Sequence, residues 1–145
     1  MTRAKLIQWA LDDPQPRGLS DIEIETLSRI IREKFDIQIP DGYADFLKMM
    51  NGFSFNGFNV YCYINDDIKK NIDEMLAFDI IDANERFCDC ADNDDYLLIG
   101  DSSTDYIAYI KKTKKYLIMS NGLDHEAEFD TFNEMFFYFI NATIE

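Results

Sequence analysis

The sequence IPDGYADFLKMMNGFSFNGF, residues 39–58, changes abruptly from a helical to an extended pattern. The apolar residues of its first half are spaced as on one face of a helix; they are Tyr43, Phe46, Leu47 and Met50. Asn51-Gly52 follows and predicts a left-handed helix cap, because Asn and Gly tolerate positive φ. Asn56-Gly57 then lies between two phenylalanines and is the dipeptide favoured in type I′ hairpin turns. The stretch therefore predicts a helix, a sharp stop and a β-hairpin in direct succession.

Four further segments carry helical spacing; they are residues 4–12, 20–35, 66–87 and 132–144. The second and fourth open on the pairs of a capping box, in which two side chains bond each other's backbone; the pairs are Ser20 with Glu23 and Thr131 with Glu134. The third segment reads as two helical pieces, and an extended alternative stays open for residues 76–81. The last segment is apolar almost all round, so we expect its helix to be buried on more than one face.

The second half of the chain is mostly extended. Alternation or short apolar runs predict strands at 60–64, within 95–103, on both sides of a turn in 105–122, and within 125–132. We interpret the Lys-rich turn, residues 111–115, as a charged device that discourages pairing at a sheet edge. A chain of 145 residues fits one domain. The order of elements predicts an α+β fold in which a mostly antiparallel sheet is packed with helices.

The charge balance excludes some classes of partner. The chain has 28 acidic and 14 basic residues, a formal net charge of −14. Such a surface repels nucleic acid and anionic lipid and attracts a cationic partner. The alternative is that the negative charge serves only to keep the protein soluble. No stretch approaches the roughly 18–20 apolar residues of a membrane span, and no signal-peptide pattern is visible. We therefore expect no nucleic-acid or membrane partner and a cytoplasmic location.

Residues with catalytic or metal-binding chemistry are few and isolated. Cys62, Cys88 and Cys90 have neither the spacing of a zinc site nor that of a disulfide framework. The single histidine, His125, reads as a surface residue in an acidic turn. No P-loop, nucleophile elbow or dinucleotide-binding glycine pattern occurs. We therefore expect no catalytic residue, no metal and no cofactor.

Residues 90–105 form a strongly acidic segment with five aspartates; they are Asp92, Asp94, Asp95, Asp101 and Asp105. A calcium-binding EF-hand loop counted from Asp92 fails, because Leu97 stands at the turn-glycine position and Ser103 at the bidentate-Glu position. We interpret the segment as a solvated loop that leads into a buried strand, with incidental binding of a divalent cation as the alternative.

The motifs, in their order, resemble those of the SUKH superfamily, which includes the fungal Smi/Knr regulators of cell-wall synthesis. The first match joins a hydrophobic-Pro pair, an aromatic, Phe-Leu on a helix and Asn-Gly before a strand; its residues are Ile39, Pro40, Tyr43, Phe46, Leu47, Asn51 and Gly52. Later matches are DIIDANERF, YLLIGDSSTDYIAYI, KKYLIM and EFDTFNEMFFYFI. The resemblance covers about residues 39–140 and is nearest to the YrhA-like branch. The loop after Gly100 departs from it, since many relatives carry a further glycine or a tryptophan there.

This resemblance implies a non-enzymatic α+β protein with a single SUKH-like domain over residues 1–145. Many bacterial members are immunity proteins that bind and neutralise a cognate toxin, often a nuclease, whereas fungal members are regulatory interaction proteins. We therefore expect a protein partner. Our first hypothesis is a basic toxin domain, the alternative is a regulatory scaffold without a toxin, and the third is an enzyme that uses aspartates or a divalent ion.

The candidate contact residues are acidic groups that would meet a cationic partner and aromatic groups that would anchor it. They are Asp92, Asp94, Asp95, Asp101, Asp105, Tyr63 and Tyr106. For each, the alternative is a solvated loop position or a core aromatic.

Overall fold

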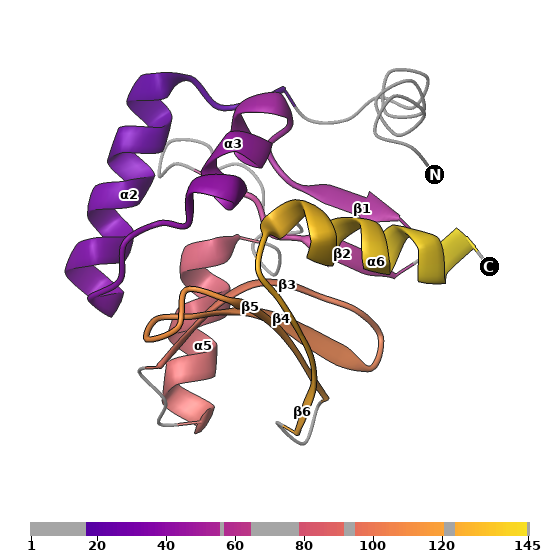
Figure 1. Ribbon diagram of the computed structural model, residues 1–145. Helices are drawn as coiled ribbons and strands as arrows, with labels where there is room; N and C mark the ends of the chain where they lie inside the picture. The colour runs from indigo at the N-terminus through magenta and orange to yellow at the C-terminus, as the bar shows by residue number, and fades with distance from the viewer. Residues whose placement is uncertain (1–16, 56, 65–78, 92–94, 121–123, 145) are drawn as a thin grey trace.

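The computed structural model describes residues 17–55, 57–64, 79–91, 95–120 and 124–144 (Figure 1). Its elements are helices α2 (Asp21–Phe35), α3 (Asp41–Met49), α5 (Ile80–Ala91) and α6 (Phe132–Ile144) and strands β1 (Phe53–Phe55), β2 (Phe58–Val60), β3 (Tyr96–Asp101), β4 (Asp105–Ile110), β5 (Tyr116–Ser120) and β6 (His125–Phe129). The predicted helix at 4–12 lies outside the described residues. The α+β class with an antiparallel sheet is confirmed.

The sheet has six strands in the order of the chain, β1-β2-β3-β4-β5-β6, and each neighbouring pair is antiparallel. Short connections join four of the five neighbouring pairs, whereas residues 61–95, which include α5, connect β2 to β3. The predicted Asn56-Gly57 hairpin is confirmed, since Phe55 pairs with Phe58 and Gly57 has a φ of 84°. Strands β1 and β6 are the two edges of the sheet.

Helices cover both faces of the sheet. Tyr116 and Phe129 are paired across β5 and β6, and their rings contact Phe132 and Tyr138 of α6. Tyr106 points to the opposite face from its strand neighbours Asp105 and Ile107, as alternation requires, and its ring contacts Phe87 of α5. Helix α3 packs beside α6, where the Phe46 ring contacts those of Phe132 and Phe136 in tilted arrangements. Helices on both faces of the sheet are needed because the interior residues of β3 are buried on both faces.

The predicted end of the third helix is wrong in position. Helix α3 ends at Met49, and Met50 is extended, with φ −151° and ψ 135°, because it forms a bridge with Arg17. The positive φ predicted for Asn51-Gly52 occurs at Gly52, with a φ of 96°, two residues after Met50. An added Cβ at Gly52 would lie 2.8 Å from Cβ of Cys62, so glycine is also required by space. The dipeptide therefore shapes the entry to β1 rather than the helix cap.

Two other predictions about elements need correction. Strand β2 ends at Val60 instead of continuing to residue 64. The Tyr61 N–H still donates to the Ile99 carbonyl of β3, but Cys62 leaves the sheet and forms a bridge with Asp79. The Lys-rich turn joins β4 to β5, which are interior strands, so it does not protect a sheet edge. Its lysines form ion pairs instead, of Lys111 with Asp36 at 3.0 Å and Lys115 with Asp130 at 3.6 Å.

The helix boundaries follow from capping. Ser20 caps α2 and forms the complete predicted box with Glu23, and Thr131 accepts a bond from the Glu134 N–H at the start of α6. Most apolar residues of α6 are buried, as predicted, but Tyr138 is 52% exposed. Helix α6 therefore presents an aromatic side chain to solvent beside the β6 edge.

Candidate partner-binding surface

Among the described residues, the structure separates Asp95 from Asp101 and Asp105. Asp92 and Asp94 lie outside the described residues. Asp95 precedes β3, whereas Asp101 ends it, and six residues of extended chain separate them by about 20 Å. The described aspartates therefore belong to two opposite ends of the sheet.

Asp101 serves the fold. Its Oδ1 accepts a hydrogen bond from Nδ2 of Asn59 and its Oδ2 accepts one from the Tyr61 hydroxyl, both at 2.8 Å. Burial, and then the adjacent Asp101 carboxylate, raise the pKa of Tyr61 well above its ordinary value, so this phenol stays protonated and donates. Asp101 thereby ties β3 to the β2 segment with both oxygens.

Asp105 lies at the start of β4 and organises the β3–β4 turn. Its N–H donates to Oγ of Ser102 at 3.0 Å, and the Ser102 N–H donates to its carbonyl at 2.7 Å. Its carboxyl group also meets that of Glu126, and the hydrogen bond between the two raises the pKa of Glu126. Of the three predicted aspartates that the structure describes, Asp105 is the one beside the exposed carboxylates of β6.

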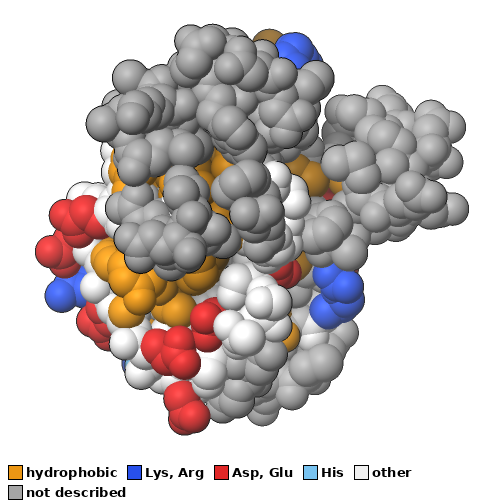
Figure 2. All heavy atoms as spheres, turned by 90° about the vertical axis from the view of Figure 1, so that its right-hand side faces the viewer, with side chains coloured by type: hydrophobic (Ala, Val, Ile, Leu, Met, Phe, Trp, Pro, Cys, Tyr) orange, Lys and Arg blue, Asp and Glu red, His pale blue; other side chains and the backbone are white. Residues whose placement is uncertain are grey.

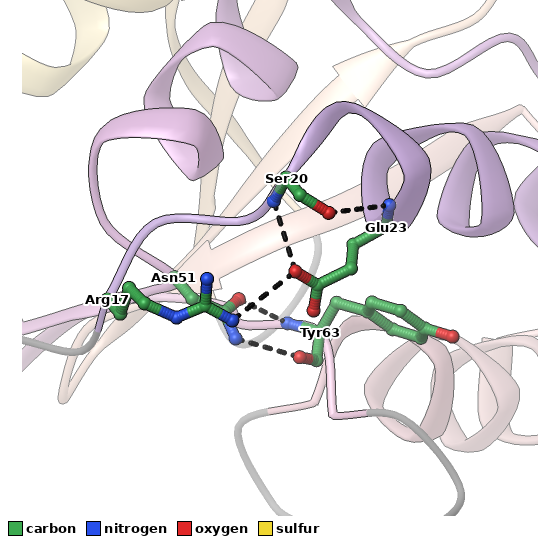
Figure 3. A network of polar contacts seen from close by, with 5 residues as sticks. All are labelled: Arg17, Ser20, Glu23, Asn51 and Tyr63. Carbon is green, nitrogen blue, oxygen red and sulfur yellow. Dashed lines mark hydrogen bonds and ion pairs between the residues drawn. The ribbon is translucent and has the colours of Figure 1, made fainter.

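The two predicted tyrosines do not form an exposed anchor. Tyr63 is only 8% exposed, and its backbone is held by the side-chain amide of Asn51, which accepts from the Tyr63 N–H and donates to its carbonyl, both at 2.8 Å (Figure 3). Tyr106 is half-buried, with its ring centroid 6.2 Å from that of Phe87. Both are better described as parts of the packed interior.

Figure 3 also shows how the start of α2 is held, beside the bonds between Asn51 and Tyr63. The Glu23 carboxylate accepts from the Ser20 N–H at 3.1 Å and from Nη2 of Arg17 at 3.5 Å. The backbone hydrogen bond from Ser20 is the main cause that lowers the pKa of Glu23. The network therefore holds the helix N-terminus and offers no uncommitted acid for a ligand.

Asp79 and Asn84 are the buried polar side chains among the described residues, and both bond to backbone. Asp79 accepts from the N–H groups of Ile64 and Asp82, at 2.8 and 3.1 Å. Asn84 donates to the carbonyls of Ile80 and Leu98 and accepts from the Leu98 N–H. Sequence reasoning missed both roles, which are structural because Asp79 holds the backbone of Ile64 and Asn84 joins α5 to Leu98 of β3.

A different acidic surface lies along β6, and sequence reasoning did not select it. It consists of Asp105, Glu126, Glu128, Phe129 and Tyr138, which we call the β6 surface. Glu126 and Glu128 are exposed, and the rings of Phe129 and Tyr138 contact each other with centroids 5.2 Å apart. Figure 2 shows hydrophobic side chains bordered by Asp and Glu on the side of the molecule that lies to the right in Figure 1. The available signal was the alternation of acidic residues through HEAEF, the last predicted strand.

His125 begins β6 and is not in a turn, contrary to the prediction. Its Nε2 lies 2.9 Å from the Tyr96 hydroxyl, and its ring meets the Tyr96 ring edge-on. In the part of the chain that the structure describes, no three His, Cys, Asp or Glu side chains are placed to share a metal ion. His125 thus has a local aromatic partner rather than a constellation around it.

A small cleft of about 250 Å³ lies between α3 and α6. Its walls include Phe46, Phe132 and Phe136, and at its rim Met49 is 45% exposed. The polar groups around it, Asp45 and Asn133, come from opposite helices. The cleft is mainly the seam between two packed helices.

No family model matches this chain, and no curated protein matches it. Among the described residues, the helices are too short or too polar for any of them to cross a membrane. The β6 surface, with exposed carboxylates on an edge strand and the exposed Tyr138 against the half-buried Phe129, is thus the feature of the described structure best suited to contact another molecule.

Proposed function

We propose that this protein is a non-enzymatic, cytoplasmic immunity protein of the SUKH superfamily, which neutralises a basic, nuclease-type bacterial toxin by forming a complex with it. The observation that carries the proposal is the β6 surface, where the exposed Glu126 and Glu128 share a strand with Phe129, whose ring contacts Tyr138, in a molecule of net charge −14. The order of motifs that resembles the superfamily supports the same assignment.

The physical basis is charge complementarity. A nuclease must attract phosphate and therefore carries positive potential around its active site. An acidic surface steers such a partner into encounter and discourages neutral or acidic ones. Tyr138, half exposed beside Phe129, supplies the kind of aromatic anchor that contributes much of the affinity in protein interfaces.

We propose no catalytic role for the chain. The buried polar side chains of the described residues, Asp79 and Asn84, hold backbone groups of the fold. Catalysis by a carboxylate needs a group set beside a substrate site, and Asp101 instead spends both oxygens on Asn59 and Tyr61. Inhibition by occlusion requires none of this chemistry.

The proposal predicts a gene for a basic, nuclease-like toxin beside this one, and the test is co-expression of its product with and without this protein. Cells that express the toxin alone should stop growing, and this protein should restore growth and co-purify with the toxin. The double variant Glu126→Lys with Glu128→Lys should lose protection. The matched variant Glu25→Lys with Glu33→Lys makes the same charge change at exposed positions of α2, far from β6 in Figure 1, and should still protect.

Growth that does not depend on this protein would refute the immunity function. Stable association without protection would favour the regulatory-scaffold alternative instead.

A further inference from the structure

We propose that the free edge of β6 binds an extended basic segment of the partner as a seventh, antiparallel strand, in which Lys or Arg alternates with apolar residues. This inference rests on the proposed function only in taking the partner to be a basic protein. The binding mode itself follows from the hydrogen-bond register of the sheet and from the side chains on both of its faces.

The register shows which backbone groups of β6 point outward. In antiparallel sheets, an interior residue directs its N–H and C=O to one neighbouring strand, and the next residue directs them to the other. The Ile110 N–H donates to the Lys115 carbonyl, so odd-numbered residues of this stretch, including Leu117, face β4. The Ser120 N–H donates to the Asp124 carbonyl, which places the even-numbered residues toward β6, in agreement.

Glu128 is consequently the residue whose backbone is turned away from the sheet. Ala127 and Phe129 pair with Ile118 and Tyr116, two residues that face β6, whereas Glu128 lies opposite Leu117. Its N–H and C=O therefore point to the outer side, where no strand of the described residues is paired. Exposed edges of this kind are templates for a further strand.

The side chains define what the added strand carries. Cross-strand neighbours share a face of the sheet, so the residue opposite Glu128 lies beside its carboxylate, and a Lys or Arg there is favoured. The residue beside Phe129 points to the other face, where it meets the Phe129–Tyr138 pair, and an apolar side chain is favoured. The resulting pattern alternates basic and apolar residues.

Charge also argues against a second copy of this chain as the occupant. An antiparallel pairing of two β6 strands about a two-fold axis would bring Glu126 and Glu128 of one copy toward the same residues of the other. Like charges directly opposite in a sheet are destabilising. The acidic edge therefore repels its own copies and attracts a basic chain.

The probe is a short capped peptide in which Lys alternates with Val, titrated into the full chain by calorimetry. Two N-methylated forms of the peptide, one methylated at the Lys positions and one at the Val positions, keep its charge. They differ only in which edge of the peptide strand can donate backbone hydrogen bonds. In an antiparallel docking, the Lys opposite Glu128 donates its N–H to the Glu128 carbonyl, whereas the Val N–H groups point away. Methylation at the Lys positions should weaken binding at least about tenfold, and methylation at Val should leave it unchanged within about twofold.

Variants of the chain test the same geometry. Glu128→Pro removes the outward N–H without touching the β5 ladder, since proline is tolerated where an edge N–H faces solvent, and it should abolish binding. Glu128→Gln keeps the backbone and should weaken binding mainly at low salt. Hydrogen exchange of the Glu128 amide should slow when the peptide is bound, a readout that needs no variant to fold.

Equal affinity of the two methylated peptides would overturn strand addition, as would an unchanged exchange rate at Glu128. If the control variant Glu25→Lys with Glu33→Lys lost as much peptide binding as the Glu128 variants, net charge alone would explain the loss. That result would also overturn strand addition. A concentration-dependent dimer of the chain would identify a second copy as the occupant instead. Peptide binding without protection from the toxin would refute the proposed function and leave this inference standing.

Discussion

Single polar side chains replace backbone partners at two places in this protein. The amide of Asn51 bonds both the N–H and the carbonyl of Tyr63, and the amide of Asn84 does the same for Leu98. An asparagine side chain has one donor group and one acceptor, as a peptide unit has, and can thus act as a short extra strand. Asn51, just after α3, thereby holds the segment that follows β2, and Asn84 joins α5 to β3.

Loss of the Asn84 amide should destabilise the protein strongly. Asn84→Ala leaves the N–H and carbonyl of Leu98 without the bonds that Asn84 supplies, and Leu98 is 2% exposed. Unsatisfied buried groups cost about 1–3 kcal/mol each, so we expect the free energy of unfolding to fall by about 2–4 kcal/mol. Urea unfolding measures it. Asn133→Ala, at an exposed position of α6, is the control and should change it by less than about 0.5 kcal/mol.

The carboxyl pair of Asp105 and Glu126 predicts a pH-dependent stability change. The hydrogen bond to Asp105 raises the pKa of Glu126 above its ordinary 4.5, so the folded state favours protonated Glu126 more than the unfolded state does. Ionisation of Glu126 as the pH rises through this pKa therefore lowers stability. Glu126→Gln should raise the melting temperature near neutral pH and lose that gain as the pH falls below about 4.5.

Thermal unfolding at several pH values tests this, with Glu25→Gln as the control for loss of one surface charge. If Glu126→Gln raised the melting temperature equally at acidic and neutral pH, the result would contradict a role for the carboxyl pair of Asp105 and Glu126.

At the scale of elements, the sheet is shaped by two irregularities in register. Pairing of β3 with β4 skips a residue between Leu98 and Gly100, and pairing of β5 with β6 shifts between Ile118 and Met119. Such bulges bend a strand and increase its twist. The second one lies where Glu126 meets Asp105, so the local shape of the candidate surface depends on it.

Gly100 is the residue that lets β2 approach the first bulge. A Cβ at this position would lie 2.4 Å from the carbonyl oxygen of Asn59, a backbone atom of the neighbouring strand. We expect Gly100→Ala to push β2 and β3 apart and to lower the free energy of unfolding by about 1–3 kcal/mol. Chemical denaturation measures this change.

Gly57→Asn is a suitable comparison for that variant. Gly57 has a φ of 84° and no atom within 4 Å of an added Cβ, and asparagine tolerates such a conformation. A nearly unchanged stability is expected there. If Gly100→Ala were equally neutral, the close approach of β2 and β3 would not constrain the fold.

At the scale of the whole molecule, the acidic charge is the dominant property of the surface. Among the described residues, surface ion pairs join Arg17, Lys34, Lys48, Lys111 and Lys115 to an aspartate or glutamate, as Lys111 meets Asp36. Exposed pairs of this kind contribute only about 0–1 kcal/mol, so the excess of negative charge remains a net repulsion. The same excess would draw a basic partner toward the molecule.

Screening should therefore stabilise the folded protein. Sodium chloride shortens the Debye length from about 30 Å at about 0.01 M to about 3 Å at about 1 M, which weakens repulsion among exposed carboxylates. We expect the melting temperature, measured by calorimetry, to rise over this range. The variant Glu25→Lys with Glu33→Lys lowers the net charge from −14 to −10 and should gain less from salt. An equal gain in both proteins would attribute the effect to something other than net charge.

The sequence by itself determined the elements whose signals are local. The capping box of Ser20, the Asn-Gly hairpin, the alternation in β4 and the apolar run of β5 each act within a few residues, and the structure confirms these elements. Together they were sufficient to predict an α+β fold with an antiparallel sheet. The acidic composition is likewise independent of conformation, and the cationic partner that it favours stays a prediction.

Only the tertiary structure decided where these elements stop and which acids share a surface. Met50 leaves the helix because Arg17, distant in sequence, bridges it, and β2 ends because Cys62 turns to Asp79. Asp95 and Asp101 are near in sequence, yet an extended strand sends them to opposite ends of the sheet. Asp105 and Glu126 are distant in sequence but meet because β4, β5 and β6 lie side by side. Long-range pairing, which local patterns do not encode, therefore placed the candidate surface on β6.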